Sequence, residues 1–593
     1  MPRTLIGAVL ALALSARANL PSNLNEKTVT ELQAMMAAGE LTSVQLTHYY
    51  IDRINQLDQN GPGVNAVIEL NPDALAIAGN ADSMRARGKV LGPLHGIPVL
   101  LKDNIDTGDS MQTSAGSFAL VGSPAKRDST VAANLRAGGA VILGKTNLSE
   151  WANFRSFESI SGWSGRGGLT NNPYFIDRNA CGSSSGSGAA ASANFAAVSF
   201  GSETDGSIVC PGNVNNVVAI KPTVGLTSRA GVVPISHTQD TVGPHARTVA
   251  DAAAALSVIQ SRTFDGRDPA TRGVPLGWRN RFTRPKDIPT DYTKFLDPKG
   301  LKGKRIGITR VGLAGFGPPG FPNFVATPQP VLDAIESAFQ ALTDAGATVI
   351  DLDASGASFT PASGEFGVLL YEFKNDLAAY FATRKGVPVA GGTLQTAIDF
   401  NNAHAAQEMP YFNQDIFDLS NSLDTTNPDA PQDPGLFGAD AHGNSSYNIS
   451  LDLDQAAGVS MDDILARFHL DAVVSATDNP AWASDYIYGD HFLFGTSGLA
   501  AGPGYPIVQV PAGEIHGVPF GISFFGTAFS EGKLIGLASG YEAFRQARAK
   551  NLPQFLPTLP DQPNAAESPP AKPSSAVSRG ATVRKADRMP KHL

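Results

Sequence analysis

The chain has 593 residues, of which 42% are hydrophobic and 17% charged, and its formal net charge is −9. This composition is typical of a globular protein, and the length allows one large domain or a few of ordinary size. The mild acidity excludes a strongly basic nucleic-acid-binding protein and gives no indication of an anionic membrane partner. We therefore expect neither nucleic acid nor membrane among its partners.

The first residues have the layout of a secretory signal peptide. Arg3 precedes an apolar run over residues 5–14, and Ala16 and Ala18 form a small-residue cleavage site. The run is too short to span a bilayer, and no later stretch is long enough to do so. We predict a signal peptide over 1–18, cleaved near Ala18, and a secreted or periplasmic protein. An N-terminal helix of the fold is the alternative, disfavoured because helix caps are absent here.

Capping residues and apolar periodicity predict the first elements of the fold. Thr28 and Thr42 stand where helices begin. Residues 92–101 predict a turn and a short buried strand that leads directly into Lys102, and residues 140–143 predict a second strand. An alanine-rich stretch over 189–200 predicts a buried helix followed by a strand.

Strands and helices alternate again from residue 301. A strand is expected at 305–309, a helix with an apolar stripe over 332–342, and another strand at 348–352. Two more strands (505–511 and 518–525) precede a closing helix after Ser530. The stretches 263–300 and 400–450 are rich in Pro, Asn, Asp and Gly, which predicts long surface excursions.

This alternation predicts an α/β fold with a mixed, mostly parallel central sheet surrounded by helices. We expect a single large domain over 19–556. Residues 557–593 are rich in Pro, Ser and Ala and lack apolar periodicity, which predicts a disordered tail.

Two short motifs match other kinds of site, but the residues within or before them do not fit those sites. Residues 139–146 match a phosphate-binding loop formally, but the four residues between its glycines are Ala-Val-Ile-Leu, a strand rather than a bare loop. Residues 182–186 match G-x-S-x-G, with Ser184 as nucleophile. The residues before them form a poor strand, and no histidine and acid can be paired with Ser184 from the sequence.

A larger set of motifs is informative. CGSSSGSG (181–188) is followed by an alanine-rich segment, GSETDGSIVCP (201–211) and AIKPT (219–223); GIPVLLKD (96–103), GKTN (144–147), QDTVGP (239–244) and PAG (511–513) accompany them. On these motifs the chain resembles the amidase signature family over most of residues 25–550, and is most similar to its peptide amidase branch. Two residues depart from the wider family: Asp205 and Ala219 each replace a glycine, and Asp205 agrees with the peptide amidase branch.

The resemblance implies the amidase signature fold and a Ser–cis-Ser–Lys triad, with Ser207 as nucleophile, Ser183 as the bridging serine and Lys102 as base. A lysine accepts a proton only when neutral, and burial at the end of an apolar strand lowers its pKa. A turn of exposed backbone N–H groups can form an oxyanion hole. We expect these donors from Thr204, Asp205, Gly206 and Ser207.

Each of these residues also has an ordinary interpretation. Lys102 could be a strand-end surface lysine, the serines around Ser183 a flexible linker, and Ser207 a turn serine. The combined pattern, rather than any one residue, favours the catalytic interpretation.

The chain has two cysteines, Cys181 and Cys210. Two buried free thiols are the state that we favour, because one pair in so long a chain is no disulfide scaffold. A disulfide between them is the alternative that export to an oxidising compartment permits.

The predicted function is hydrolysis of carboxamide bonds by a serine hydrolase without cofactor or metal. The resemblance to the peptide amidase branch implies C-terminal peptide amides as substrates and ammonia as product. Aryl or alkyl acylamides, carbamates and esters remain open as substrates, because the pocket walls are expected from the variable 360–500 region. A tRNA-dependent amidotransferase subunit is disfavoured by the signal peptide. A non-catalytic binding protein on this fold is disfavoured by the intact triad. The expected partner is a small-molecule or peptide amide, and the protein is expected to be a monomer or homodimer.

Overall fold

The structure is a computed structural model that describes residues 24–272, 284–316 and 325–558. The predicted signal peptide (1–18) lies outside the described residues, and so do residues 559–593 of the predicted tail. No helix in the described ranges is both long and apolar enough to cross a lipid bilayer.

One large sheet organises the chain. It has 11 strands, in the order β1 (Val67–Leu70), β3 (Val141–Thr146), β2 (Pro98–Lys102), β6 (Val198–Glu203), β8 (Thr241–Ala246), β7 (Val218–Lys221), β14 (Ile507–Ile515), β15 (Val518–Phe525), β13 (Ala472–Ala476), β9 (Arg305–Ile308) and β12 (Thr348–Asp351). Most of these strands are buried along their whole length, which accounts for their apolar sequences.

The sheet is mixed, as expected, but it is not mostly parallel. Antiparallel pairs run through its centre from β6 to β13, and parallel pairs lie towards each end, where β2 pairs with β3 and β6, and β9 pairs with β12 and β13. The predicted proportion was wrong because β14 and β15 are joined by a short turn and β7 and β8 by a loop without a helix. Neighbouring parallel strands need a long crossover connection, whereas antiparallel neighbours can be joined by a short turn.

Helices pack on this sheet and on one another. The N-terminal group is α2 (Val29–Ala38), α3 (Ser43–Leu57), α4 (Ala74–Ala86) and α5 (Thr130–Ala137); the sheet also contacts α6 (Ser185–Ser192), α7 (Val209–Val214), α8 (Val249–Ile259), α9 (Gln329–Asp344), α16 (Glu531–Arg545) and α17 (Ala547–Lys550). Thr28 and Thr42 cap α2 and α3 with their side chains, as the sequence predicts. The short helices α6 and α7 contact each other beside the strands that carry the candidate site.

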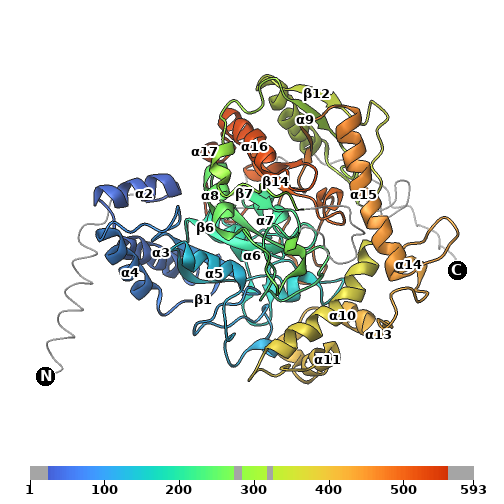
Figure 1. Ribbon diagram of the computed structural model, residues 1–593, viewed down its shortest axis with the longest axis horizontal. Coiled ribbons are helices and arrows are strands. Elements are labelled where there is room, and N and C mark those ends of the chain that lie inside the picture. Colours follow the sequence, from blue (N-terminus) through green and yellow to red (C-terminus); the bar gives the residue numbers. More distant parts are fainter. Residues whose placement is uncertain (1–23, 273–283, 317–324, 559–593) are drawn as a thin grey trace, which may run out of the picture.

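The predicted surface excursion over 400–450 is instead partly helical. Helices α10 (Glu365–Thr383), α11 (Leu394–Ala403) and α13 (Asp415–Ser422) share an apolar cluster that includes Phe373, Leu394 and Phe417. Figure 1 shows these helices grouped at one side of the molecule, with α14 (Pro434–Phe437) and α15 (Tyr447–Arg467) beyond them. The excursion was predicted because turn residues separate these short helices, each of which buries only a few apolar side chains. The described part of 263–300 has only two short 3₁₀ turns, Pro269–Arg272 and Tyr292–Phe295.

The formal phosphate-loop motif is part of the sheet. Gly144, Lys145 and Thr146 belong to β3, and the buried Lys145 ammonium donates to the Ile105 carbonyl (2.7 Å) and to Thr113 Oγ1 (2.9 Å). As predicted, this motif forms a strand rather than a bare loop.

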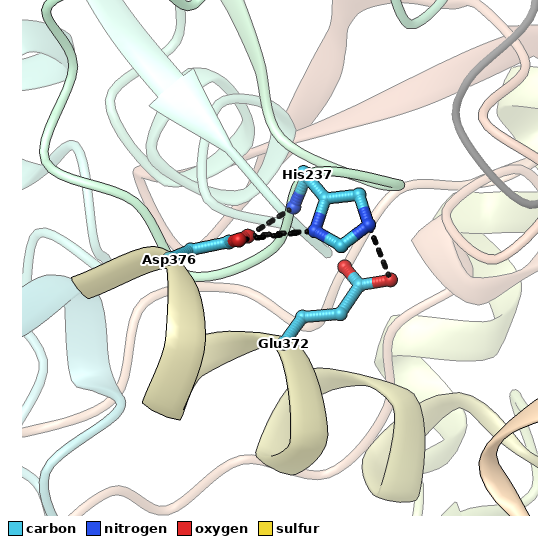
Figure 2. Close-up of side chains that lie close together, drawn as sticks. All are labelled: His237, Glu372 and Asp376. Atoms are coloured by element: carbon cyan, nitrogen blue, oxygen red, sulfur yellow. Dashed lines mark hydrogen bonds and ion pairs between the residues drawn. The ribbon is translucent and has the colours of Figure 1, made fainter. Parts of the chain in front are cut away.

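An ion-paired histidine joins the loop between β7 and β8 to α10. His237 lies between Asp376 (Nδ1 to Oδ2, 2.9 Å) and Glu372 (Nε2 to Oε1, 3.5 Å). The three side chains are close enough to hold a metal ion. In Figure 2, however, the two ring nitrogens face different carboxylates on opposite sides of the ring, the arrangement of an imidazolium ion pair rather than of a chelate. Burial lowers the pKa of His237, but Glu372 and Asp376 outweigh it and raise that pKa to about 9.

We expect His237→Gln to reduce stability in a pH-dependent way. Because the folded-state pKa lies above the ordinary value of 6.5, the contribution of the ion pair is complete below pH 6.5 and is lost as pH rises through about 9. The His237 side chain is one-third exposed, so we expect a loss of only about 1–2 kcal/mol at pH 6 and little loss at pH 10. Urea-induced unfolding of the wild-type and variant proteins at the two pH values measures this loss of stability. A difference that does not change with pH would contradict the ion-pair assignment.

Candidate active site

Strand β2 delivers Lys102 into the interior. The three residues before it are apolar and fully buried, and so is Lys102 itself. The ammonium lies 2.8 Å from Ser183 Oγ, 3.1 Å from the carbonyl oxygen of Ser202 and 3.0 Å from Ser202 Oγ. The strand therefore places an amine against the predicted bridging serine, with two further oxygen atoms to orient it.

The surroundings of Lys102 favour its neutral form. Burial lowers the pKa of Lys102 from 10.5 to about 7, although the carboxyl groups of Asp240 and Glu203 act in the opposite direction. Desolvation disfavours a charged amine more strongly than these two acids, themselves buried, can favour it. Lys102 can therefore exchange a proton near neutral pH.

Ser183 lies in the turn that precedes α6. The peptide bond between Gly182 and Ser183 is cis. The carbonyl of Ser183 accepts from the Ser149 N–H (3.1 Å), so the turn is fixed to the segment that follows β3.

Ser184, the residue that the G-x-S-x-G motif suggests, is fully buried. Its hydroxyl donates to the Ser202 carbonyl (2.9 Å) and accepts from the Ser202 N–H (3.2 Å). Its own N–H donates to the Ser207 carbonyl (3.1 Å), which brings the two serine segments side by side. The Ser184 hydroxyl is thus bound to the backbone of β6, and its rejection as nucleophile stays a prediction.

Ser207 lies in the turn between β6 and α7. The buried carboxyl group of Glu203 accepts hydrogen bonds there from the N–H groups of Gly206 (3.0 Å), Ile208 (2.6 Å) and Val209 (2.9 Å). Gly206 has φ of +79°, a conformation that favours glycine. Glu203 therefore shapes the turn and holds Ser207 at the wall of a cavity.

The four predicted oxyanion donors are not equivalent. The Gly206 N–H already donates to Glu203, whereas the N–H groups of Asp205 and Ser207 have no acceptor within the described part of the chain. Thr204 is fixed through its hydroxyl, which donates to Asp240 Oδ1 (2.6 Å). The backbone N–H of Thr204, like those of Asp205 and Ser207, has no acceptor within the described residues, so Gly206 is the one of the four whose N–H is already engaged.

The cavity beside Ser207 has a volume of about 460 Å³. Its wall combines acidic, polar and aromatic side chains, and none of the described lining residues is a lysine or arginine. It is lined by Ala152, Asn153, Phe154, Ser161, Cys181, Gly182, Thr204, Asp205, Gly206, Ser207, Cys210, Ile235, Leu369, Asp478, Trp482, Asp490, Phe492, Gly495, Ser497 and Gly498. The prediction that residues 360–500 form the pocket walls is met in part: 8 of the 20 lining residues come from this region, and the other 12 lie between positions 152 and 235.

The two cysteines form a disulfide. Cys181 and Cys210 are bonded, with Cα atoms 6.0 Å apart. The favoured prediction of two free thiols was wrong, because residues 29 positions apart in the chain are brought together where α6 and α7 pack against each other. Sequence spacing alone cannot reveal such a contact.

Three polar residues of the site were not singled out in the sequence. Ser202 contacts Lys102 through two atoms, Asn104 donates to Ser202 Oγ (2.9 Å), and Asp240 accepts from Thr204 and from the Ile235 and Ser236 N–H groups (2.9 and 3.0 Å). All three lie in or beside motifs that the sequence analysis quotes, so proximity to those motifs was the available signal.

Comparison with known proteins agrees with this geometry. The profile of the family described as Amidase matches residues 45–409. The chain is 36% identical over 543 residues to a putative amidase from Arthroderma benhamiae, covering 88% of this chain and 83% of that protein. It is 39% identical over 533 residues to a probable amidase from Arabidopsis thaliana, covering 88% and 90% respectively.

A solved structure is similar over the whole fold. The native peptide amidase from Stenotrophomonas maltophilia is 43% identical and superposes with a TM-score of 0.76, over 90% of this chain and all of that one (100%). The match of profile, sequence and fold shows that this chain belongs to the amidase signature family and is an amide-hydrolysing enzyme.

Proposed function

We propose that the enzyme hydrolyses C-terminal peptide amides to peptide acids and ammonia, with Ser207 as nucleophile, Ser183 as proton bridge and Lys102 as base. The observation that carries the proposal is the 2.8 Å contact between the buried Lys102 amine and Ser183 Oγ, next to a cavity that Ser207 lines. The similarity to a solved peptide amidase supports the choice of substrate.

In the proposed first step, neutral Lys102 accepts the Ser183 hydroxyl proton while Ser183 accepts that of Ser207. Ser207 Oγ then attacks the amide carbonyl carbon, and the oxygen atom takes up negative charge. The N–H groups of Asp205 and Ser207 stabilise that charge. Neither donates to another acceptor in the described part of the chain, so the oxygen atom has no bond to displace. The proton returns through Ser183 to the leaving nitrogen, which departs as ammonia.

In the second step, water replaces ammonia. Lys102 and Ser183 remove its proton by the same route, the water oxygen attacks the acyl–Ser207 ester, and the peptide acid leaves with Ser207 restored. Every proton moves between this chain and the reactants, so the proposed route needs no cofactor.

The cavity supports an extended amide substrate. Its volume of about 460 Å³ suits a drug-sized ligand or the last residues of a peptide. Trp482, Phe492 and Phe154 offer apolar contact area, and polar groups lie among them. We further propose that the protein acts outside the cytoplasm, on the basis of the signal-like sequence over 1–18.

A substrate panel tests the proposed substrate class. We expect ammonia release from neutral C-terminal dipeptide amides at a kcat/KM at least about 10-fold above that for hydrolysis of matched anilides and methyl esters. The peptides should be uncharged near the amide, because none of the described lining residues is a lysine or arginine that could pair with a carboxylate. Faster turnover of anilides or esters would assign the enzyme to another substrate class of the family.

Labelling tests the nucleophile. A serine-reactive fluorophosphonate should modify Ser207, and Ser207→Ala should lose the adduct and lower kcat by about 10⁴-fold or more. Ser184→Ala is the matched control: the adduct should still form at Ser207, because the Ser184 hydroxyl binds only the Ser202 backbone. Peptide mass mapping locates the adduct, and an adduct on Ser184 would refute the mechanism.

The rate should follow the protonation of Lys102. Since the base is neutral only above its pKa of about 7, kcat/KM should rise with pH through that value and then level off. Lys102→Ala should lower kcat/KM by about 10³-fold or more and remove this rise. Lys102→Arg carries a permanent positive charge, so its kcat/KM should be as low as that of the alanine variant. Retention of the rise in either variant would exclude Lys102 as its origin.

A further inference from the structure

The Cys181–Cys210 disulfide joins the two segments that carry the serines of the site. Cys181 stands two residues before Ser183, and Cys210 stands three residues after Ser207. Both cysteines are buried and line the same cavity as Ser207. The cross-link therefore lies at the site rather than at a remote part of the fold.

Several hydrogen bonds also hold these two segments, and some of them reach the same strand: the Ser184 hydroxyl binds the Ser202 backbone on β6, one residue before Glu203. The Ser183 segment is bound through the Cys181 N–H, which donates to Asn179 Oδ1 (2.7 Å), and through the Ser183 carbonyl, which accepts from Ser149. The Ser207 turn is bound by the Glu203 carboxyl group at the end of β6. The disulfide, the Ser184 N–H to Ser207 carbonyl bond (3.1 Å) and a bond from the Asn215 side-chain amide at the end of α7 to the Ala180 carbonyl (3.0 Å) connect one segment directly to the other.

We propose that this disulfide is a positioning element of the reaction, and that its reduction to two thiols lowers turnover in a protein that remains folded. The inference rests on the proposed function. Proton transfer between two hydroxyl groups requires them within hydrogen-bond reach, and a displacement of about 1 Å can cost about 10²-fold in rate. A covalent bond so near both serines restricts their relative displacement more tightly than the hydrogen bonds between the segments do, because it cannot open thermally.

The rest of the fold does not depend on this bond. The strands pair through backbone hydrogen bonds along the whole sheet, and the largest apolar cluster includes neither cysteine. The cysteines belong to a small cluster with Val214, Trp482 and Val518. Reduction is therefore expected to loosen the site before it unfolds the domain.

A phosphine reductant tests the proposal on the full-length oxidised protein. The phosphine supplies two electrons and takes up oxygen from water as phosphine oxide, the S–S bond breaks, and each sulfur gains a proton. Mass spectrometry after alkylation under denaturing conditions should then find two free thiols per chain. We expect kcat for a neutral dipeptide amide to fall at least about 10-fold, while KM changes less than about threefold. The rate of fluorophosphonate labelling at Ser207 should fall in parallel, and oxidised glutathione should restore both.

Two controls separate positioning from general stability. The double variant Cys181→Ser with Cys210→Ser should have the low kcat of the reduced protein and no response to phosphine, and wild-type protein exposed to phosphine oxide should be unchanged. Circular dichroism should show reduced protein folded at the assay temperature. Unchanged kcat in protein with two free thiols overturns the proposal, and so does a loss of activity that follows a loss of folded structure. Oxidised protein that releases no ammonia and forms no Ser207 adduct overturns the proposed function and this inference together.

Discussion

The structure around the candidate site depends on the burial of one amine. Lys102 ends a strand whose preceding residues are apolar and inaccessible to solvent. An ammonium group in that place loses its hydration, and hydrogen bonds to Ser183 and Ser202 replace only part of it. The resulting fall of its pKa to about 7 makes an ordinarily inert cation able to exchange protons.

The acids near Lys102 raise its pKa and so oppose the effect of burial. Their hydrogen bonds to other groups limit this opposition. The Glu203 carboxyl group is engaged by three N–H groups of the Ser207 turn, and Asp240 by Thr204 and two further N–H groups. Burial raises the pKa of both acids, that of Asp240 to about 6. These groups therefore shape the backbone around Ser207 without contributing a close ion pair to Lys102, which would hold the amine in its charged form.

The sequence predicted those elements whose formation depends on residues close together in the chain. The strand before Lys102, the capped helices at Thr28 and Thr42 and the α6–β6 unit follow from apolar runs and capping residues, and the structure confirms them. Features set by contacts distant in sequence were predicted less well. The proportion of parallel strands depends on which strands become neighbours, the disulfide depends on the packing of α6 against α7, and the helices over 400–450 depend on an apolar cluster with α10.

The same distinction explains why the chemistry is easier to infer than the substrate. Lys102, Ser183 and Ser207 stand on or beside β2, α6 and β6. The turns next to these elements hold the three residues in place, and their residue types are recognisable as motifs in the sequence. The opposite wall of the cavity comes from Leu369 on α10 and from the loop that contains Trp482 and Phe492. These side chains are held by packing among helices and loops, so substitutions there can reshape the cavity without disturbing the amine or the turn around Ser207. In the proposed mechanism, reaction type and substrate choice therefore belong to different segments of the chain.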